Sequence, residues 1–418
     1  MGSTLISRIN QLQRLANGIL EERFKENFLN AYIEDTSFLT KNILGREIEV
    51  PSKLLRQSRL EDLNQLQSRF PIGTVAVLVP KNSIGLTVAK AIASSFLMGN
   101  RTLIYFPASL KNTGPIYAEL LKSHLNDVEV ITGGLSSAAF MRKCIKDPAV
   151  KAIVVYGDDN WIDAYKPLAS EFKTKIVFEG PGNDPMVVFP DANLKDAVKG
   201  ALEGGLNNGG QSCSALERFF VHQSCYSDFL GLLVEALSDF KLGGPSELET
   251  DIGPIRSSII FNRLIQQIES AKAMGATIAL GGEVVLDAET DLPILQPTVI
   301  GNCNIQMPVV QEESFGPVFP LVSFDSEQEL IQMLDETRYG LNACAYGTTP
   351  KLVQDYLEST HRNVYYNSTA ASSCNLPTRL MDGGFKRSGF IWDFTTEGIE
   401  TTGRRMLAME LSKVNSNS

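Results

Sequence analysis

The chain has 418 residues, of which 43% are hydrophobic and 21% charged, and its formal net charge is -10. These proportions are those of an ordinary globular protein, and the length allows two or three domains with large cores. The negative charge argues against nucleic acid as a partner, because phosphate binding needs a basic surface. No apolar run reaches the roughly 18 residues of a membrane-spanning helix. We therefore expect a cytoplasmic protein without a membrane partner.

Residues 1 to about 70 are predicted to be helical, ending in the polar stretch 56–69. In the first helix, apolar side chains recur at the spacing of one helix face, at Leu5, Ile9, Leu12, Ala16 and Ile19. A stripe of this kind indicates an amphipathic surface helix rather than a signal peptide.

From residue 74 onward, short apolar runs rich in β-branched residues alternate with helical segments. This alternation is typical of parallel strands joined by crossover helices. One series of strands precedes residue 181 and a second series follows it, so the sequence predicts two doubly wound α/β domains. The predicted strands are 74–79, 102–106, 128–131, 152–156 and 175–178, then 186–189, 219–222, 277–280, 320–324, 343–346 and 363–366. A last strand is predicted over 404–412.

The cysteines are scattered and form no CxxC pair, which is the pattern of a reduced protein rather than of a disulfide framework. The three histidines leave little material for a metal site or a Ser-His triad, so no metal is predicted. The six cysteines are at positions 144, 213, 225, 303, 344 and 374.

Cys213 and Glu179 are the residues most suggestive of chemistry. Cys213 lies among small residues in the glycine-rich run 207–215, and Glu179 precedes it by 34 residues. An open thiol can attack a carbonyl, and a separate carboxylate can then activate water, which are the two halves of covalent acyl chemistry. A lone cysteine is more often a small buried hydrophobe. The assignment therefore depends on the rest of the sequence.

The rest of the sequence resembles the aldehyde dehydrogenase superfamily in an ordered series of short sequence blocks between about Pro71 and Leu411. Each block is weak alone, but their order and spacing make the resemblance strong. The blocks are Pro71-Ile72-Gly73, Pro80-Lys81-Asn82, Gly99-Asn100 with Pro107, Glu179-Gly180-Pro181-Gly182, Gly210-Gln211-Ser212-Cys213, Glu312-Glu313-Ser314-Phe315-Gly316-Pro317, Tyr339-Gly340-Leu341 and Gly383-Gly384-Phe385-Lys386-Arg387-Ser388-Gly389.

The resemblance implies an organisation for the whole chain. Residues 1–181 would form N-terminal helices and a Rossmann-like dinucleotide-binding domain, and residues 182–385 a catalytic domain carrying the cysteine. Residues 386–418 would return to the cofactor domain and end in an oligomerisation strand, which implies a homodimer or homotetramer. An edge strand of the chain's own sheet is the alternative for 404–412. The family's cofactor domain looks shortened ahead of Pro71.

The resemblance also implies catalytic roles. Cys213 matches the nucleophile, and its thiolate is expected to be favoured by the surrounding amides. Asn82 matches a side-chain donor to the oxyanion, with the backbone N–H of Cys213 as the second donor. The alternative for Asn82 is turn chemistry after a strand. Glu179 matches the general base that activates the hydrolytic water.

For the cofactor, NAD or NADP, Glu313 matches the residue that holds the nicotinamide ribose hydroxyls, and Phe315 would pack against that ribose. Further contacts are predicted at Val79, Pro80, Phe106, Gly157 and Asp158.

Two departures from the family pattern concern the adenosine end of that cofactor. Phe106 stands where a ribose-binding lysine is usual. In the phosphate turn, Asp158 and Asp159 follow Gly157, so two carboxylates are expected to face the phosphates. Like charges oppose binding, which predicts weak dinucleotide binding and a preference for NAD over NADP.

The resulting prediction is oxidation of a small-molecule aldehyde to a carboxylic acid through a cysteine thiohemiacetal and thioester. A non-catalytic scaffold and an acyl-thioester reductase are the alternatives. The aldehyde tunnel is expected to be lined by Ser83, Ile84, Leu86 and the loop 368–376. No arginine cluster for an acidic substrate is obvious, although Arg379 could supply one charge.

Overall fold

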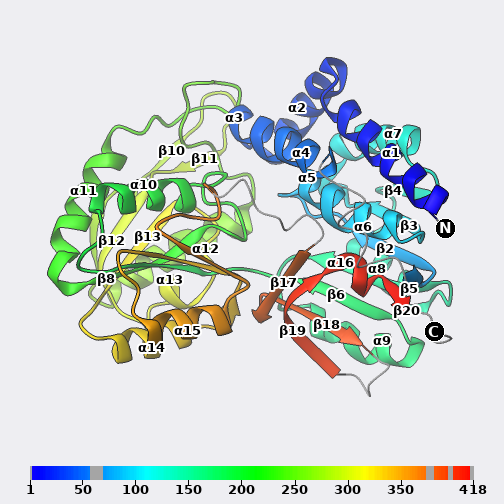
Figure 1. The fold of residues 1–418 in the computed structure, drawn as a ribbon. Helices are drawn as coiled ribbons and strands as arrows, with labels where there is room; N and C mark the ends of the chain where they lie inside the picture. The colour runs from blue at the N-terminus through cyan, green and yellow to red at the C-terminus, as the bar shows by residue number, and fades with distance from the viewer. Residues whose placement is uncertain (1, 57–68, 373–380, 394–398, 415–418) are drawn as a thin grey trace.

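The computed structural model describes residues 2–56, 69–372, 381–393 and 399–414. Two α/β bodies lie side by side (Figure 1). The first body is built on a nine-stranded sheet and includes the N-terminal helices. The second body is built on a seven-stranded sheet. The C-terminal strands return to the first body, as the red end of the chain in Figure 1 shows.

The N-terminal helices cover one face of the first body. The first of them buries the predicted apolar stripe, with Leu12, Ala16 and Ile19 completely inaccessible to solvent. Burying such a stripe is what stabilises an amphipathic helix on a sheet. The helices are α1 Gly2–Ile19, α2 Glu22–Thr36, α3 Thr40–Ile43 and α4 Val50–Arg56, with a π-helical turn, Leu44–Glu49, between the last two.

The nine-stranded sheet has the order β14-β17-β19-β18-β6-β5-β2-β3-β4. Its strands β6, β5, β2, β3 and β4 are mutually parallel, which confirms the predicted doubly wound pattern. The C-terminal strands extend this sheet in antiparallel fashion from β6. The strands are β2 Thr74–Leu78, β3 Arg101–Phe106, β4 Val128–Thr132, β5 Val150–Tyr156, β6 Lys175–Glu179, β14 Tyr339–Gly340, β17 Met381–Lys386, β18 Gly389–Asp393 and β19 Ile399–Met406.

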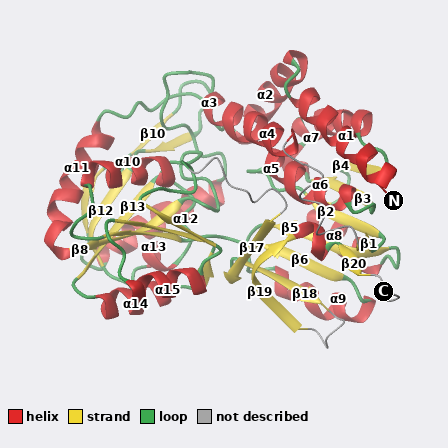
Figure 2. Ribbon diagram, in the orientation of Figure 1, coloured by secondary structure: helices red, strands yellow, loops and turns green. Residues whose placement is uncertain are grey.

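Helices pack on both faces of this sheet (Figure 2). One face carries α5, α6 and α7 together with the N-terminal helices, and the other carries α8 and α9. A second π-helical turn, Val88–Ile92, joins α5 to α6. The helices are α5 Ile84–Thr87, α6 Ala93–Leu97, α7 Thr113–His124, α8 Ser137–Lys146 and α9 Lys166–Phe172.

The seven-stranded sheet has the order β16-β15-β7-β8-β13-β12-β9 and is parallel except for β9. Helices α10 and α11 cover one face, and α12, α14 and α15 cover the other. The predicted strands of this half are confirmed, and β12 and the hairpin β10–β11 are additional. The elements are β7 Asp184–Val188, α10 Leu194–Gly205, β8 Leu216–His222, α11 Tyr226–Ser238, α12 Ser258–Ala273, β9 Thr277–Leu280, β10 Val284–Leu286, β11 Pro293–Leu295, β12 Thr298–Cys303, α13 Pro308–Gln311, β13 Val318–Phe324, α14 Glu327–Asp335, β15 Asn342–Tyr346, α15 Lys351–Thr360 and β16 Asn363–Tyr366.

The prediction of one strand over 404–412 was wrong. Strand β19 ends at Met406, a single helical turn α16 (Leu407–Glu410) follows, and β20 (Ser412–Val414) pairs with β1 (Arg69–Pro71). Leu407, Ala408 and Leu411 are completely or almost completely buried. Spacing of one and four residues places these three side chains on one face of a helical turn, so burial selects the helix over the strand.

None of the helices in the described part of the chain combines the length and the apolarity that crossing a membrane requires. The same residues contain no group of three or more His, Cys, Asp or Glu side chains placed to hold a metal ion.

Candidate active site

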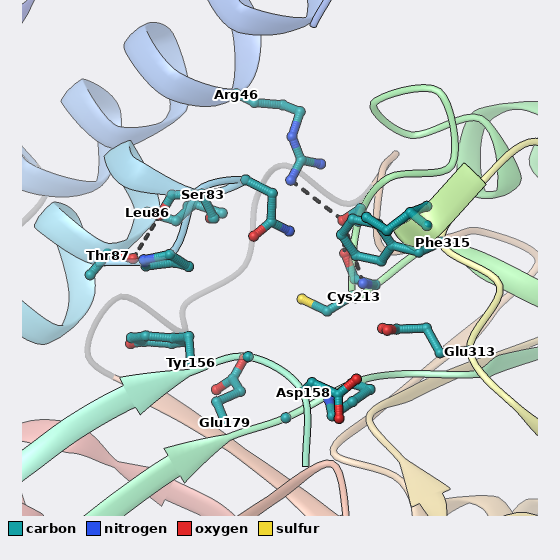
Figure 3. A pocket seen from close by; sticks show the side chains of 18 of the residues that line it. Arg46, Ser83, Leu86, Thr87, Tyr156, Asp158, Glu179, Cys213, Glu313 and Phe315 are labelled. Carbon is teal, nitrogen blue, oxygen red and sulfur yellow. Dashed lines mark hydrogen bonds between the residues drawn. The ribbon is translucent and has the colours of Figure 1, made fainter. Parts of the chain in front are cut away.

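A pocket of about 330 Å³ is lined by residues from both bodies. In the first body, it lies at the carboxyl ends of the parallel strands β5 and β6, where open α/β sheets commonly bind ligands. The second body contributes the cysteine turn and the segment that carries Glu313 and Phe315. In Figure 3, Cys213, Glu179 and Glu313 lie around the same open space.

A tight turn presents Cys213 to this pocket. Asn208, Gly209 and Gly210 all have positive φ angles of 58°, 64° and 77°, which is why small residues and Asn are needed there. Gly182 packs directly beneath the turn, since a Cβ at this position would lie 1.9 Å from the Cys213 carbonyl oxygen. The sulfur is thereby held at the pocket wall. Among the described cysteines, Cys213 is partly exposed, whereas 144, 225, 303 and 344 are buried.

The expectation that the surrounding amides favour the thiolate form of Cys213 is not met in this structure. Burial raises the pKa of the Cys213 thiol to about 12, and the negative charges of Glu179 and Glu313 add to the effect. Arg362 and Arg46 act in the opposite direction. The thiol is therefore neutral at neutral pH, and its proton must be removed as the sulfur attacks.

Asn82 lies in the turn after β2 and lines the same pocket as Cys213. The preceding carbonyl, that of Lys81, accepts a hydrogen bond of 2.7 Å from the hydroxyl of Tyr32, which anchors the turn to α2. Within the described part of the chain, the side-chain amide of Asn82 forms no hydrogen bond. The amide is thus available to a ligand in the pocket.

Glu179 is the last residue of β6 and is 8% exposed. Its Oε1 lies 3.0 Å from Nη1 of Arg362, and its Oε2 accepts a hydrogen bond of 3.3 Å from the backbone N–H of Gly383. Sequence reasoning missed Arg362, because its position 183 residues away carries no signal of the contact.

Glu313 lies across the pocket from Glu179 (Figure 3) and accepts a hydrogen bond of 3.2 Å from the N–H of Gly182. Burial raises its pKa to about 8, with Asp158 and Asp184 adding to the shift and Arg263 opposing it. A carboxyl group poised between charge states can both donate to and accept from hydroxyl groups.

The backbone around Phe315 is strained, with φ at 61°, and a buried carboxyl group holds it. Both oxygens of Glu217, on β8, accept hydrogen bonds of 2.7 Å, from the N–H groups of Ser314 and Phe315. Sequence reasoning also missed this residue. Glu217 therefore fixes the segment that presents Glu313 and Phe315 to the pocket.

The other predicted cofactor contacts divide into two groups. Pro80, Gly157 and Asp158 line the pocket. The side chains of Val79 and Phe106 are completely buried, and Phe106 stacks on Tyr117 with 6.2 Å between ring centroids. Both side chains belong to the core, so only the backbone of these two residues could contact a cofactor.

Asp159 does not face the pocket as expected. It is 2% exposed, and its carboxylate forms ion pairs with Arg387 at 3.1 Å and Arg338 at 3.3 Å. Only Asp158 of the pair lines the pocket. The predicted double repulsion of phosphates is therefore reduced to one exposed carboxylate.

Besides Arg362, three cations that sequence reasoning missed line the pocket: Arg46, Lys90 and Arg263. Arg46 comes from the π-helical turn 44–49, and Lys90 comes from the π-helical turn 88–92. Such turns are frequent at functional sites. Arg46 donates hydrogen bonds to Asn207 Oδ1 and, at 3.4 Å, to Ser212 Oγ, next to the nucleophile (Figure 3).

The residues expected to line the aldehyde tunnel differ in their position relative to the pocket. Ser83 and Leu86 line the pocket, but Ile84 is completely buried in the core. In the loop 368–376, residues 373–376 lie outside the described residues, as does Arg379.

Comparisons with known proteins identify the family of the chain. The model of the Aldehyde dehydrogenase family matches residues 33–404. A succinate-semialdehyde dehydrogenase [NADP(+)] of Mycobacterium bovis is 27% identical over 332 residues, which cover 79% of this chain and 71% of that protein. A succinate semialdehyde dehydrogenase [NAD(P)+] of Escherichia coli is 29% identical over 343 residues, covering 81% and 72%.

Solved structures share the fold. A betaine aldehyde dehydrogenase from Staphylococcus aureus in complex with NAD+ has a TM-score of 0.83 at 24% identity, covering 98% of this chain and 84% of that one. A lactaldehyde dehydrogenase from Escherichia coli has a TM-score of 0.84 at 22% identity, covering 98% and 86%. Because the family model spans most of the sequence, the chain belongs to the aldehyde dehydrogenase family and is an enzyme that oxidises aldehydes with NAD(P).

Proposed function

We propose that Cys213, Asn82 and Glu179 carry out this oxidation in the pocket between the two bodies. The observation that supports the proposal is their convergence: a thiol, an amide and a carboxylate from three separate segments line one pocket. Each has a different chemical role in acyl chemistry.

In the first half of the reaction, the S–H proton of Cys213 passes to the Glu179 carboxylate and on to solvent as the sulfur bonds to the aldehyde carbon, and the carbonyl oxygen becomes anionic. The Asn82 amide and the backbone N–H of Cys213 are the proposed donors to this oxygen. Donors held in place before the reaction stabilise such charge without having to reorganise.

The residues present fit the nicotinamide end of NAD(P). Glu313 and Phe315 would hold the ribose, and Pro80, Gly157 and Asp158 line the same pocket. When bound, the cofactor supplies the acceptor for the hydride lost by the adduct carbon. Glu179 then removes a proton from water as the water oxygen attacks the thioester carbon. The C–S bond breaks, the carboxylic acid leaves, and the proton returns to the sulfur.

Rapid mixing of the enzyme with an aldehyde and NAD tests the proposal through reduced cofactor at 340 nm and acid product. Cys213→Ser should lose turnover by at least about a thousandfold, since the nucleophile is gone. Cys225→Ser, a buried thiol away from the pocket, is the matched control and should retain activity. Retained turnover in Cys213→Ser would exclude this assignment.

The substrate class is proposed to be an aldehyde that carries a carboxylate. Arg46 is in the pocket wall, and within the described residues its recorded hydrogen bonds go to neutral acceptors rather than to a carboxylate. An arginine in this position can bind a carboxylate with two hydrogen bonds. The names of the similar proteins, succinate-semialdehyde dehydrogenases, support the same class.

A comparison of succinic semialdehyde with butanal, which has the same chain length but no charge, tests the substrate class. The wild type should prefer the charged aldehyde in kcat/KM, and Arg46→Met should reduce that preference by about tenfold or more. Equal loss for both aldehydes would mean that Arg46 supports the pocket without recognising charge.

Homodimer or homotetramer formation and a cytoplasmic location also remain proposals, supported by the family. Light scattering on the purified full chain would measure the oligomeric state. Fractionation of the source cells would show the location of the protein.

A further inference from the structure

Arg362 forms a nearly buried ion pair with the carboxylate of Glu179. Their side chains are 13% and 9% exposed, and the Nη1–Oε1 distance is 3.0 Å. The same Nη1 lies 3.3 Å from the carbonyl oxygen of Gly383, whose N–H donates to the second carboxylate oxygen of Glu179. Both oxygens of Glu179 are therefore held.

Arg362 is itself held by a buried network. Its Nη2 donates a hydrogen bond of 3.3 Å to Asn342 Oδ1. Asn342 in turn donates to both oxygens of Asp184, from Nδ2 at 2.8 Å and from its backbone N–H at 3.0 Å. Asp184 is 1% exposed. A side chain anchored in this way loses little freedom on pairing, so the ion pair is preorganised.

The ion pair also joins the two bodies of the molecule. Glu179 ends a strand of the nine-stranded sheet, whereas Arg362, Asn342 and Asp184 lie on or beside strands of the seven-stranded sheet. The cysteine turn belongs to the second body as well. Arg362 therefore ties Glu179 to the body that carries the thiol.

We propose that Arg362 is a positioning residue for hydrolysis of the acyl-enzyme: it orients Glu179 and keeps it ionised down to mildly acidic pH. This inference rests on the proposed function. An opposite charge at this distance favours the charged carboxylate, so the base remains available for water where an unpaired buried glutamate would take up a proton. In the step itself, the water proton goes to Glu179, the C–O bond forms, and the C–S bond breaks with its electron pair on sulfur.

Other charged and titratable side chains share the environment of Glu179. Within the described residues, those lining the pocket are Arg46, Lys90, Tyr156, Asp158, Cys213, Arg263 and Glu313, and Asp184 lies behind Arg362. The thiol does not titrate in an acyl-enzyme, because its sulfur is esterified. The pH dependence of hydrolysis therefore reports on the carboxyl groups rather than on Cys213.

The test uses p-nitrophenyl acetate, which transfers an acetyl group to a thiol and requires neither aldehyde nor NAD(P). Excess ester is removed, and intact-protein mass spectrometry then follows loss of the acetyl group between about pH 5 and pH 8. The variants are Arg362→Gln, which removes the charge, and Arg362→Lys, which keeps it. Arg101→Gln is the matched control, because it breaks an exposed Arg–Glu pair with Glu129 on the same sheet.

For the wild type, we expect a hydrolysis rate that stays flat down to about pH 5.5, near the ordinary range of an ionised glutamate. In Arg362→Gln, the acid limb should move up by at least about one pH unit. In Arg362→Lys, which keeps the positive charge, the limb should lie close to its wild-type position. Arg101→Gln should match the wild type. If Arg362→Gln lowers the plateau or the stability without moving the limb, Arg362 is only structural and the proposal is overturned.

Two further outcomes are decisive. If Arg362→Gln does not fold, the wild type and Glu179→Gln decide together: an acid limb at or above about pH 6.5 that is lost in Glu179→Gln refutes the proposal, and one below about pH 5.5 supports it. If the acetyl group fails to attach to Cys213, shown by an unchanged acetylation pattern in Cys213→Ser, the proposed function itself fails. A failure of the positioning role alone would look different: Cys213 would be acetylated normally, but Arg362→Gln would leave the pH of the acid limb unchanged.

Discussion

At the scale of single residues, the nucleophile is kept in a protonated resting state. Burial and two neighbouring carboxylates raise the pKa of Cys213 to about 12. We therefore predict that alkylation of Cys213 by iodoacetamide accelerates about tenfold per pH unit from pH 7 to 10, because only the thiolate reacts. Peptide mass spectrometry with timed quenching measures the rate. A rate that levels off below pH 9 would mean that the thiolate already forms near neutral pH.

Asp159 provides a second residue-scale prediction. It neutralises two arginines while almost completely buried, so Asp159→Ala should lower the free energy of unfolding by about 1–3 kcal/mol. Asp158→Ser is the matched control and should change stability little, because Asp158 is exposed at the pocket. Urea titration measures both. Equal effects of the two variants would contradict the assignment of Asp159 to a structural role.

At the scale of elements, strand β8 controls the segment between α13 and β13 through Glu217. Glu217→Ala would leave the N–H groups of Ser314 and Phe315 buried without an acceptor, at a cost of about 2–4 kcal/mol. The strained Phe315 backbone should then relax, so NAD binding should weaken as well. Calorimetric titration of NAD and urea unfolding test the two effects. Glu217→Gln, which keeps one acceptor oxygen, should lose less of each.

At the scale of the whole molecule, the buried network behind the pocket makes stability depend on pH. Burial raises the pKa of Asp184 to about 7, well above its value in an unfolded chain. The folded protein therefore binds a proton here that the unfolded chain has already lost. Stability is greatest below the unfolded value and falls as pH rises through about 7, with a slope on the order of 1 kcal/mol per pH unit.

We predict that Asp184→Asn flattens the decline in unfolding free energy between about pH 4 and pH 7. Chemical unfolding at a series of pH values is the measurement. Asp191→Asn is the control, because hydrogen bonds from Thr348 lower the pKa of Asp191 and place its titration below this window. An unchanged slope in Asp184→Asn would assign the pH dependence to another group.

Features that depend on local pattern could be predicted from the amino-acid sequence. Short β-branched runs predicted parallel strands such as β2 and β5, because a strand buried on both faces must be apolar throughout. The glycine-rich turn singled out Cys213, since positive φ angles leave a recognisable composition. Ordered blocks led to the family. Whether Cys213, Asn82 and Glu179 perform the proposed steps stays a prediction that the experiments above address.

The surroundings of those residues could not be predicted in the same way, because they depend on long-range contacts. Arg362 and Arg46 reach the pocket from opposite ends of the chain. No local sequence pattern predicts that Arg362 pairs with Glu179 or that Arg46 lines the pocket. Phe106 and Asp159 occupy positions suggestive of a cofactor site, yet one side chain is in the core and the other is paired with two arginines. The charge state of a group depends on burial and on nearby charges. Both are set by residues far apart in sequence, so they become visible only in the folded chain.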